Sequence, residues 1–574
     1  MKTHTIAEDI VKQLADYGIK QIFGITGDAM NALTDALRRD GRIDWMTVRH
    51  EETAGFAISA QAELSQSLAV GVGTIGPGAL HFINGIYNAA RDRSPVLVIT
   101  GQVPGQEQAS GYFQEVDQIK AFDDVCVFSQ TLSSADQMPR LLQQAVKAAV
   151  CQRGVAHIAI PTDLATSQIP VTKRTIQTFE PSTTAMMPLS SDIKQAADLL
   201  NNAQRPALLI GAGARGYGEL VSQLAEKLNA PVVHSLKGTE VLPYDHPNSI
   251  GGIGHVGTPH GMAVVDDCDA LIMLGTDFPY SAFLPDHDHI IQVDLNAEKL
   301  GHRCAVQVGI AADVGNAIKQ LLPHLDQSNN DTGFLTKLQE KRDKWVDQTT
   351  QKYAIESQQD NTPIHPQSVV LTLSELASDD AIFIAEVGEV TVWAARYLKM
   401  KSNQRLIGSF THGSLGVGLP AAIGAQAKYP SRQVIAMCGD GAFSMLLGDL
   451  VTAARYGLNL VAVVFKNDKF GFVELEMEAA GLPRFATDLV NPDYAQIANA
   501  SHCLGLKVEK ASDLKPTLAQ ALAADQPVVV EVTVNPDELI IPSEIDFKTA
   551  WKFTTGKIKE MVLERQIQNL FKQL

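Results

Sequence analysis

VIAMCGDG, at residues 434–441, is a short apolar run that ends in a Gly-Asp-Gly turn. A second apolar run, LVAVVF at 460–465, leads into Lys466-Asn467-Asp468. Two adjacent parallel strands would deliver Asp440 and Asn467 to the same carboxyl edge of a sheet, where open α/β folds bind ligands. Their oxygen atoms suit a hard cation such as Mg²⁺ that holds a diphosphate, although Gly-Asp-Gly is also a common turn.

The same pattern continues on both sides of this stretch. Apolar, β-branched runs alternate with longer helix-like segments, and further runs lie at 68–73, 96–100, 207–210, 270–274, 290–293 and 528–532. Strands that are apolar on both faces predict parallel sheets covered by helices. The fold expected is therefore α/β, with three doubly wound parallel-sheet domains.

Two polar segments separate these domains. Residues 172–192 and 326–366 are predicted to be linkers, the second containing a helix near 334–350. The domains expected are residues 1–180, 190–335 and 360–540, followed by a tail at 541–574.

Composition narrows the class of protein. The 574 residues are 45% hydrophobic and 19% charged, which is typical of a globular chain, and the net charge of −17 disfavours a nucleic-acid binder. No apolar run is long enough to span a bilayer, and the first residues lack the apolar core of a signal peptide. The six cysteines form no CxxC pair, so a reducing cytoplasm is expected.

Two further motifs leave alternatives open. Gly211-Ala212-Gly213-Ala214-Arg215-Gly216 fits a GxGxxG turn, but no carboxylate follows the next expected strand at 231–233, as NAD would need. A turn that binds another nucleotide, or none, is therefore favoured. Arg49-His50-Glu51-Glu52 is either a solvated charge run or a turn that buries one carboxylate for proton exchange.

Taken together, these features resemble the thiamin-diphosphate enzymes of the pyruvate oxidase and acetolactate synthase family, over about residues 3–540. The shared pieces occur in the family's order: Gly24–Asp28, Arg49–Glu51, Gly76–Gly78 with Asn84-Gly85, Gly413–Gly416 with Gly418–Pro420, Gly439–Gly441, and Asn467. Within the family, the chain is most similar to the quinone-linked pyruvate oxidases of bacteria. That similarity rests on GYFQE (111–115), GTDFPY (275–280), TVWAARYLKM (391–400), RQVIAMCGDG (432–441) and FGFVELEME (470–478).

The resemblance implies an N-terminal pyrimidine-binding domain, a central FAD domain and a C-terminal diphosphate domain. It also implies thiamin diphosphate, Mg²⁺ and FAD as cofactors, and an active site shared by two subunits of a homo-oligomer, usually a tetramer. Glu51 matches the glutamate that hydrogen-bonds the aminopyrimidine N1′ atom and controls proton removal from C2. Leu415, after Gly413 and Ser414, matches the apolar residue that bends the cofactor.

The remaining site residues also follow from the resemblance. Asp440, the Asn467 side chain and the main-chain carbonyl of Lys469 match the Mg²⁺ ligands, and Gly441 and Ala442 lie in the same cofactor turn. The residues expected near the substrate are Phe113, Gln114, Phe472, Val473 and Glu476. Those expected around FAD are Gly254, His255, Val256, Gly257, Thr276, Asp277, Phe278, Pro279, Tyr280 and Asp294.

Three positions depart from the family pattern. Lys466 stands where Asn is frequent, and Lys469 stands where a small residue is common; neither change removes a predicted ligand atom. Glu389 stands where Thr or Ser is usual near the diphosphate. Because a carboxylate would repel a diphosphate, Glu389 is expected to point away from the site.

The implied activity is oxidative decarboxylation of pyruvate to acetate, with electrons passing through FAD to a membrane quinone. The alternatives are a phosphate-dependent oxidase that makes acetyl phosphate and hydrogen peroxide, and an acetolactate synthase; a catalytically silent homologue is disfavoured. Residues 551–574 carry five basic and two acidic side chains and partly amphipathic spacing. This tail is expected either to dock on the protein or to lie on anionic lipid, which would hold a cytoplasmic enzyme reversibly at the inner face of the cell membrane.

Overall fold

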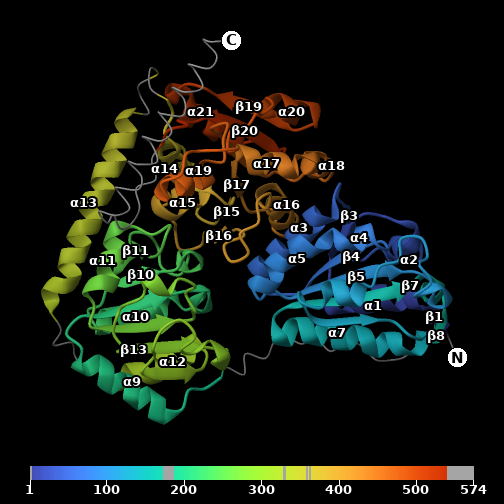
Figure 1. Ribbon diagram of the computed structural model, residues 1–574, viewed down its shortest axis with the longest axis horizontal. Helices are drawn as coiled ribbons and strands as arrows, with labels where there is room; N and C mark the ends of the chain where they lie inside the picture. Colours follow the sequence, from blue (N-terminus) through green and yellow to red (C-terminus); the bar gives the residue numbers. More distant parts are fainter. Residues whose placement is uncertain (1–2, 172–185, 327–330, 357–359, 361–362, 539–574) are drawn as a thin grey trace.

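In the computed structural model, the chain forms three sheets of six parallel strands each, with helices on both faces (Figure 1). The structure describes residues 3–171, 186–326, 331–356, 360 and 363–538. The expected strands are all present, with ends that differ by no more than two residues. This confirms the predicted three-domain α/β fold. No helix in the described ranges combines the length and the apolarity that crossing a bilayer requires.

The first domain has the strand order β3-β2-β4-β5-β7-β6. Its strands are β2 (Gln21–Gly24), β3 (Asp44–Thr47), β4 (Ala69–Gly73), β5 (Val96–Gln102), β6 (Cys126–Thr131) and β7 (Val155–Pro161), with β1 (Thr3–Thr5) pairing antiparallel to β8 (Gln168–Pro170). Its helices are α1 (Ile6–Tyr17), α2 (Asn31–Asp40), α3 (Glu51–Ser65), α4 (Pro77–Leu80), α5 (Phe82–Arg91), α6 (Gln118–Phe122), α7 (Met138–Gln152) and α8 (Thr162–Ala165).

The central domain has the order β11-β10-β9-β12-β13-β14. Its strands are β9 (Pro206–Ile210), β10 (Val232–His234), β11 (Ser249–Gly252), β12 (Ala270–Leu274), β13 (Ile290–Asp294) and β14 (Val308–Ala311). Its helices are α9 (Ser190–Asn202), α10 (Gly218–Lys227), α11 (Pro259–Asp267) and α12 (Val314–Leu321). The helix expected near 334–350 is α13 (Thr332–Glu356), which is longer than predicted and runs along the outside of the molecule to the third domain (Figure 1).

The third domain has the order β16-β15-β17-β18-β20-β19, so it repeats the strand order of the first. Its strands are β15 (Ile382–Ala385), β16 (Arg405–Ile407), β17 (Val434–Gly439), β18 (Val461–Lys466), β19 (Leu504–Val508) and β20 (Val528–Thr533). Its helices are α14 (Pro366–Leu376), α15 (Glu389–Tyr397), α16 (Gly418–Lys428), α17 (Asp440–Met445), α18 (Leu450–Arg455), α19 (Gly471–Ala479), α20 (Tyr494–Ala500) and α21 (Ala511–Leu522).

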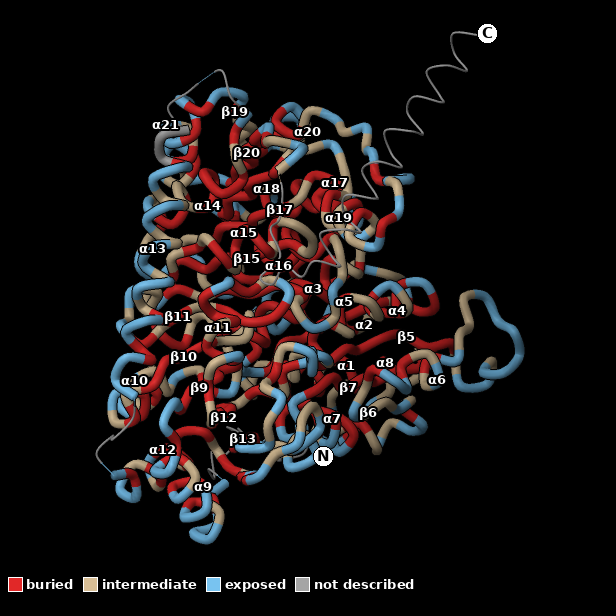
Figure 2. The backbone as a smooth tube through the Cα atoms, turned by 60° about the vertical axis from the view of Figure 1, so that its left-hand side comes forward, coloured by how far each residue is buried: buried red, intermediate tan, exposed pale blue. Residues whose placement is uncertain are grey.

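The apolar runs are explained by burial on both faces of each sheet. In β5, Val96 and Val98 face one hydrophobic cluster, whereas Leu97 and Ile99 face another on the opposite side. Successive side chains of a strand point to opposite faces, so a strand covered on both sides shows no polar alternation. Figure 2 shows the resulting buried strands enclosed by more exposed helices.

Helix α3 joins the first and third domains. Thirteen of its fifteen residues are buried, because α5 packs on one side and α16 of the third domain on the other. The α16 backbone approaches closely at Gly424, where a Cβ would lie 2.2 Å from the carbonyl oxygen of Ala57. Gln61 Nε2 also donates to the Gly424 carbonyl at 3.2 Å. A larger residue at 424 would separate the two helices.

A buried ion-pair network ties all three domains together. Lys237 of the central domain lies 2.8 Å from Glu63 and 2.7 Å from Asp92, both in the first domain. Arg215 contacts Glu63 at 3.4 Å and also pairs with Glu240. Arg405 of the third domain completes the network, with its Nε 2.7 Å from Glu240.

Candidate functional site

Asp440 lies at the carboxyl end of β17, at the first position of α17, and is buried. Its Oδ2 accepts the backbone N–H groups of Asn467 (3.0 Å) and Asp468 (2.7 Å), and its Oδ1 accepts that of Gly441 (2.8 Å). Burial raises the pKa of this carboxyl, and the three N–H donors oppose that shift. Because β18 runs parallel to β17, Asp440 and Asn467 lie side by side, as their spacing predicts.

The packing around this turn requires glycine at position 441, and a hydrogen bond orients the side chain of Asn467. A Cβ on Gly441 would lie 2.7 Å from the rings or methyls of neighbouring apolar side chains, and Ala442 beside it is buried. The Asn467 Oδ1 accepts the Lys469 N–H at 3.3 Å. The Lys469 ammonium turns away to Glu474, at 3.0 Å, so of Lys469 only the carbonyl is left as the predicted ligand.

The expectation for Glu389 is wrong. Its carboxylate points into the site, and Glu389 Oε2 accepts a hydrogen bond from Asn467 Nδ2 at 2.9 Å. Space exists because residue 471 is glycine: a Cβ there would lie 2.4 Å from Glu389 Oε1. Burial raises the pKa of Glu389 to about 7; Lys469 opposes this, while Glu474 and Asp440 add to it.

Glu51 begins α3 after β3 and is only 6% exposed. The interpretation of this carboxylate as part of a solvated charge run therefore fails. Its Oε2 lies 2.9 Å from His81 Nδ1, and the His81 ring stacks on that of His50 at 4.4 Å between centroids. A Cβ on residue 78 would lie 3.2 Å from Glu51 Oε1. The side of the carboxylate that faces Gly78 is therefore bounded by backbone without a side chain.

The turn that contains Leu415 is held by the first domain. Gly413 and Gly416 have φ values of +77° and +89°, which favour glycine. Ser414 Oγ accepts from Asn84 Nδ2 at 2.8 Å, and Leu415 is half-buried. Asn84 of α5 therefore fixes the turn that presents Leu415.

The residues predicted near the substrate lie on two surfaces. Phe113 is 78% exposed in the segment between β5 and α6, which projects from the body in Figure 2. The next residue, Gln114, has a φ of +62° and packs on Gly76. A Cβ on residue 76 would lie 2.6 Å from the carbonyl oxygen of Gln114. On α19 of the third domain, Val473 is 45% exposed and Glu476 is exposed, while Phe472 is half-buried.

The two segments predicted to bind flavin meet in the central domain. The His255 ring lies 4.8 Å from that of Tyr280 in an edge-on contact. A Cβ on Gly254 would lie 2.8 Å from the ring of Phe278. Both segments follow strands of one parallel sheet, β11 and β12, so their loops share its carboxyl edge. Of the other predicted residues there, Gly257, Thr276 and Asp294 are buried, Val256 and Asp277 are half-buried, and Pro279 is exposed.

The GAGARG stretch forms the predicted tight turn after β9. A Cβ on Gly213 would lie 2.7 Å from the Cα of Gly275, which follows β12. Strands β9 and β12 are neighbours although β10 and β11 intervene in sequence. This is the switch point of the sheet, where α/β folds leave a crevice for a nucleotide.

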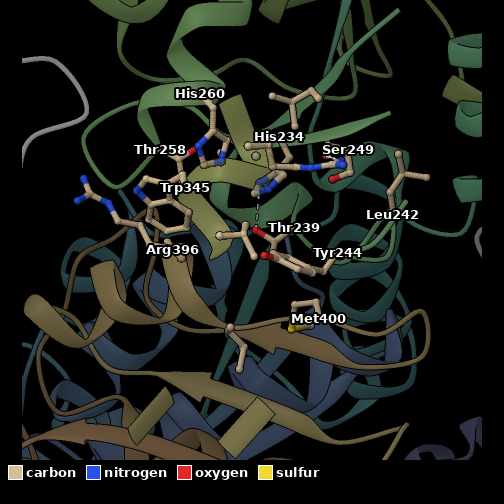
Figure 3. Close-up of a pocket in the computed structure, with 17 residues that line it drawn as sticks. His234, Thr239, Leu242, Tyr244, Ser249, Thr258, His260, Trp345, Arg396 and Met400 are labelled. Carbon is tan, nitrogen blue, oxygen red and sulfur yellow. Dashed lines mark hydrogen bonds between the residues drawn. The ribbon is translucent and has the colours of Figure 1, made fainter. Parts of the chain in front are cut away.

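Arg396, in the last turn of α15, links the third domain to one of the segments predicted to bind flavin. It donates from Nη2 to the His255 carbonyl at 3.3 Å and from Nε to the Val256 carbonyl at 3.4 Å. Arg396 also borders a small cavity of about 40 Å³, shown in Figure 3, with His234, His260 and Trp345. That space holds about two or three water molecules and is too small for a cofactor.

The donor set fits thiamin diphosphate with a divalent cation. The oxygens of Asp440 and Asn467 are ligands that Mg²⁺ prefers, and Glu51 supplies a buried carboxylate beside a glycine-lined wall. Next to Gly27 and Gly78, the Oγ1 of Thr74 is buried and, within the described part of the chain, has no hydrogen-bond partner. A polar group of a bound molecule would satisfy it.

Sequence reasoning missed Glu474, Arg396 and the partner of Glu51, His81, and it predicted the wrong orientation for Glu389. For Glu389 a signal was present, because it follows β15, which pairs with β17. The strand-end argument that selected Asp440 therefore applies to it equally. Arg396 lies within a helix and contacts another domain, so no local spacing marks it.

Comparison with known proteins gives matches over most of the chain. Residues 4–121, 193–321 and 386–532 match the N-terminal TPP-binding, central and C-terminal TPP-binding domains of the thiamine pyrophosphate enzymes. A Bacillus subtilis protein, the putative thiamine pyrophosphate-containing protein YdaP, is 36% identical over 97% of this chain and 96% of its own length. Pyruvate oxidase of Lactiplantibacillus plantarum is 28% identical over 92% and 88%. Acetolactate synthase of Mycobacterium bovis is 30% identical over 94% and 89%. The chain belongs to the thiamine pyrophosphate enzyme family.

Proposed function

We propose that this enzyme oxidatively decarboxylates pyruvate to acetate and CO₂, with FAD as the internal electron acceptor and a membrane quinone as the final one. The observation that carries this proposal is the Arg396 contact. Through Arg396, the third domain hydrogen-bonds the carbonyls of His255 and Val256, which lie in a segment predicted to bind flavin. Such a contact favours an enzyme in which the two cofactors work together. Similarity to a pyruvate oxidase supports the same substrate and reaction.

The chain's own residues would divide the work as follows. Glu51, buried beside His81, would exchange a proton with the aminopyrimidine. Asp440 and Asn467 would hold the cation and, through it, the diphosphate, and Leu415 would bend the cofactor. When bound, thiamin diphosphate would supply the carbon nucleophile for the keto group of pyruvate, FAD would take the two electrons left after CO₂ departs, and water would take the acetyl group to give acetate.

The substrate pocket would be completed by a second copy of the chain. Phe113 and Val473 are large apolar side chains exposed on different domains, and water-exposed apolar groups near a predicted site favour an interface. The segment around Phe113 would then enter the site beside α19 of the other subunit. A homotetramer is the assembly that we propose.

Quinone as acceptor would place the enzyme at the inner face of the cell membrane, with the cytoplasm as its compartment. The predicted lipid-binding tail, residues 551–574, lies outside the described residues. A variant truncated after Ser543 should keep pyruvate-dependent reduction of FAD and lose sedimentation with anionic liposomes. A full-length enzyme that ignores such liposomes at low salt with pyruvate present would contradict the membrane proposal.

One product assay tests the proposed reaction. The enzyme is supplied with pyruvate, Mg²⁺, thiamin diphosphate and FAD, with and without a quinone analogue and with and without phosphate. We expect acetate and CO₂, formed faster with the quinone analogue and unaffected by phosphate. Acetyl phosphate with hydrogen peroxide would support the phosphate-dependent oxidase, and acetolactate would support a synthase; GYFQE and FGFVELEME argue against the synthase.

A further inference from the structure

Three neighbouring strands deliver side chains to the predicted cation site. Strand β15 pairs with β17, and β17 with β18. Their carboxyl ends carry Glu389, Asp440 and Asn467 respectively, and only the last two belong to the predicted ligand set. Glu389 is the first residue of α15, after β15, and lies on the side of β17 opposite to β18; it nevertheless contacts Asn467, so it needs a separate explanation.

Asn467 is held through its side chain and through its backbone. Its Nδ2 donates to Glu389 Oε2 at 2.9 Å, and its backbone N–H donates to Asp440 Oδ2 at 3.0 Å. An amide whose NH₂ group is bound to a carboxylate presents its oxygen on the other side. Among the described residues, that oxygen has only a long contact, 3.3 Å, with the Lys469 N–H.

The surroundings keep Glu389 in place. Gly471, at the start of α19, leaves room for the carboxylate, since a Cβ would lie within 2.5 Å of three of its atoms. The Lys469 ammonium pairs with Glu474 at 3.0 Å, so Glu389 is not the main partner of Lys469. The hydrogen bond to Asn467 is the contact by which Glu389 acts on the site.

We propose that Glu389 is a positioning residue: it fixes the Asn467 amide so that Oδ1, not Nδ2, faces the divalent cation. An amide that is free to rotate would offer the cation its NH₂ group in part of the population, and NH₂ is not a ligand. Partners that orient a ligand in this way change metal affinity by about 10–100-fold.

The test is equilibrium dialysis of radiolabelled thiamin diphosphate against the apoenzyme at increasing Mg²⁺ concentration. Glu389→Ala removes the acceptor, and we expect its half-saturating Mg²⁺ concentration to rise about 10–100-fold. Glu389→Gln keeps an acceptor oxygen for Asn467 Nδ2, and we expect its value to stay within about threefold of wild type. Glu375→Ala, an exposed carboxylate on α14 of the same domain, should leave it unchanged.

Two results would overturn the proposal. One is a Glu389→Ala variant with the Mg²⁺ dependence of wild type. The other is a Glu389→Gln variant as impaired as Glu389→Ala, because charge would then be the cause. If Glu389→Ala does not fold, Glu389→Ser shortens the side chain, which removes the same contact, and supplies a hydroxyl that can cap the start of the helix. Asp440→Ala titrated in parallel separates this idea from the ligand assignment on which it rests: unchanged binding there would refute the metal site itself.

Discussion

Replacing Lys237 by methionine removes the only cation that contacts both Glu63 and Asp92 among the described residues. The lysine side chain is 15% exposed and the two carboxylates are almost wholly buried. Burial raises the pKa of Asp92 to about 6 even with Lys237 present. Burial also acts to raise the pKa of Glu63, but Lys237 and Arg215 outweigh burial and hold this pKa below its usual range. Methionine keeps most of the apolar stem, so the charge is the principal loss.

The expected cost is large because two buried carboxylates lose a partner. Breaking a buried ion pair costs about 3–5 kcal/mol. In domains of this size, each kcal/mol shifts the melting temperature by about 2–4 °C. The midpoint of thermal unfolding should therefore fall by roughly 6–20 °C at pH 7.

The pH dependence gives the second readout. Without Lys237, the pKa of Asp92 moves further above its unfolded value and Glu63 loses one of the cations that lower its pKa, so the folded variant binds more protons than folded wild type. Stability is then fully present below the unfolded pKa, about 4, and is lost as the pH rises through the raised folded pKa. The deficit relative to wild type should shrink between pH 7 and about pH 5.

Scanning calorimetry at several pH values measures both effects. Lys120→Met is the matched control, because Lys120 also pairs with a carboxylate, Asp117, but is 87% exposed; its midpoint should not change. A Lys237→Met variant that melts with wild type at pH 7, or whose deficit does not depend on pH, would refute the role of the network.

Four further changes test other parts of the molecule. Glu51→Gln should lower turnover by a factor of order 10² or more while thiamin diphosphate still binds; NMR of C2–H exchange reports this, and exchange at the wild-type rate would exclude the role. Asp440→Ala should abolish Mg²⁺-dependent cofactor binding in a fluorescence titration, and unchanged affinity would count against the ligand assignment. Arg396→Met should loosen the segment at 254–257 and weaken FAD binding, measured by flavin retained after gel filtration; full retention would contradict it. Burial lowers the pKa of His157 to about 3, so the unfolded state binds a proton first, and this histidine alone should remove about 2 kcal/mol of stability as the pH falls from 6.5 to 5; over that range His157→Asn should lose about 2 kcal/mol less than wild type in urea unfolding, and equal losses would refute this.

The sequence predicted those features that depend on local order. The apolar runs identified the strands because each strand is buried on both faces, and strand ends placed Asp440 beside Asn467. Glu389 was misjudged because only its repulsion from a diphosphate was considered. The donor that attracts it, Asn467 Nδ2, is 78 positions away, and the space it fills depends on Gly471.

Features that join domains were beyond prediction for a related reason. Lys237, Glu63 and Arg405 come from three domains, and no spacing in one sequence relates them. Helix α13 was predicted only in part because it is mostly polar; its middle packs on the third domain through contacts such as Trp345 stacked on Tyr397, with 5.4 Å between ring centroids. A single chain without aligned relatives gives no signal for such pairs.

The packing of α3 against α16 determines when the first domain can be completed during synthesis. Gln61 meets the backbone of Gly424, 363 positions later in the chain. At about 5–20 residues per second, a ribosome needs roughly 20–70 s to make the intervening segment. Throughout that interval, α16 is not yet available to cover the apolar side of α3. The newly made first domain therefore exposes an apolar surface for tens of seconds. Nascent chains arrested before residue 418 should therefore bind chaperones that recognise apolar segments, and release them once α16 has emerged.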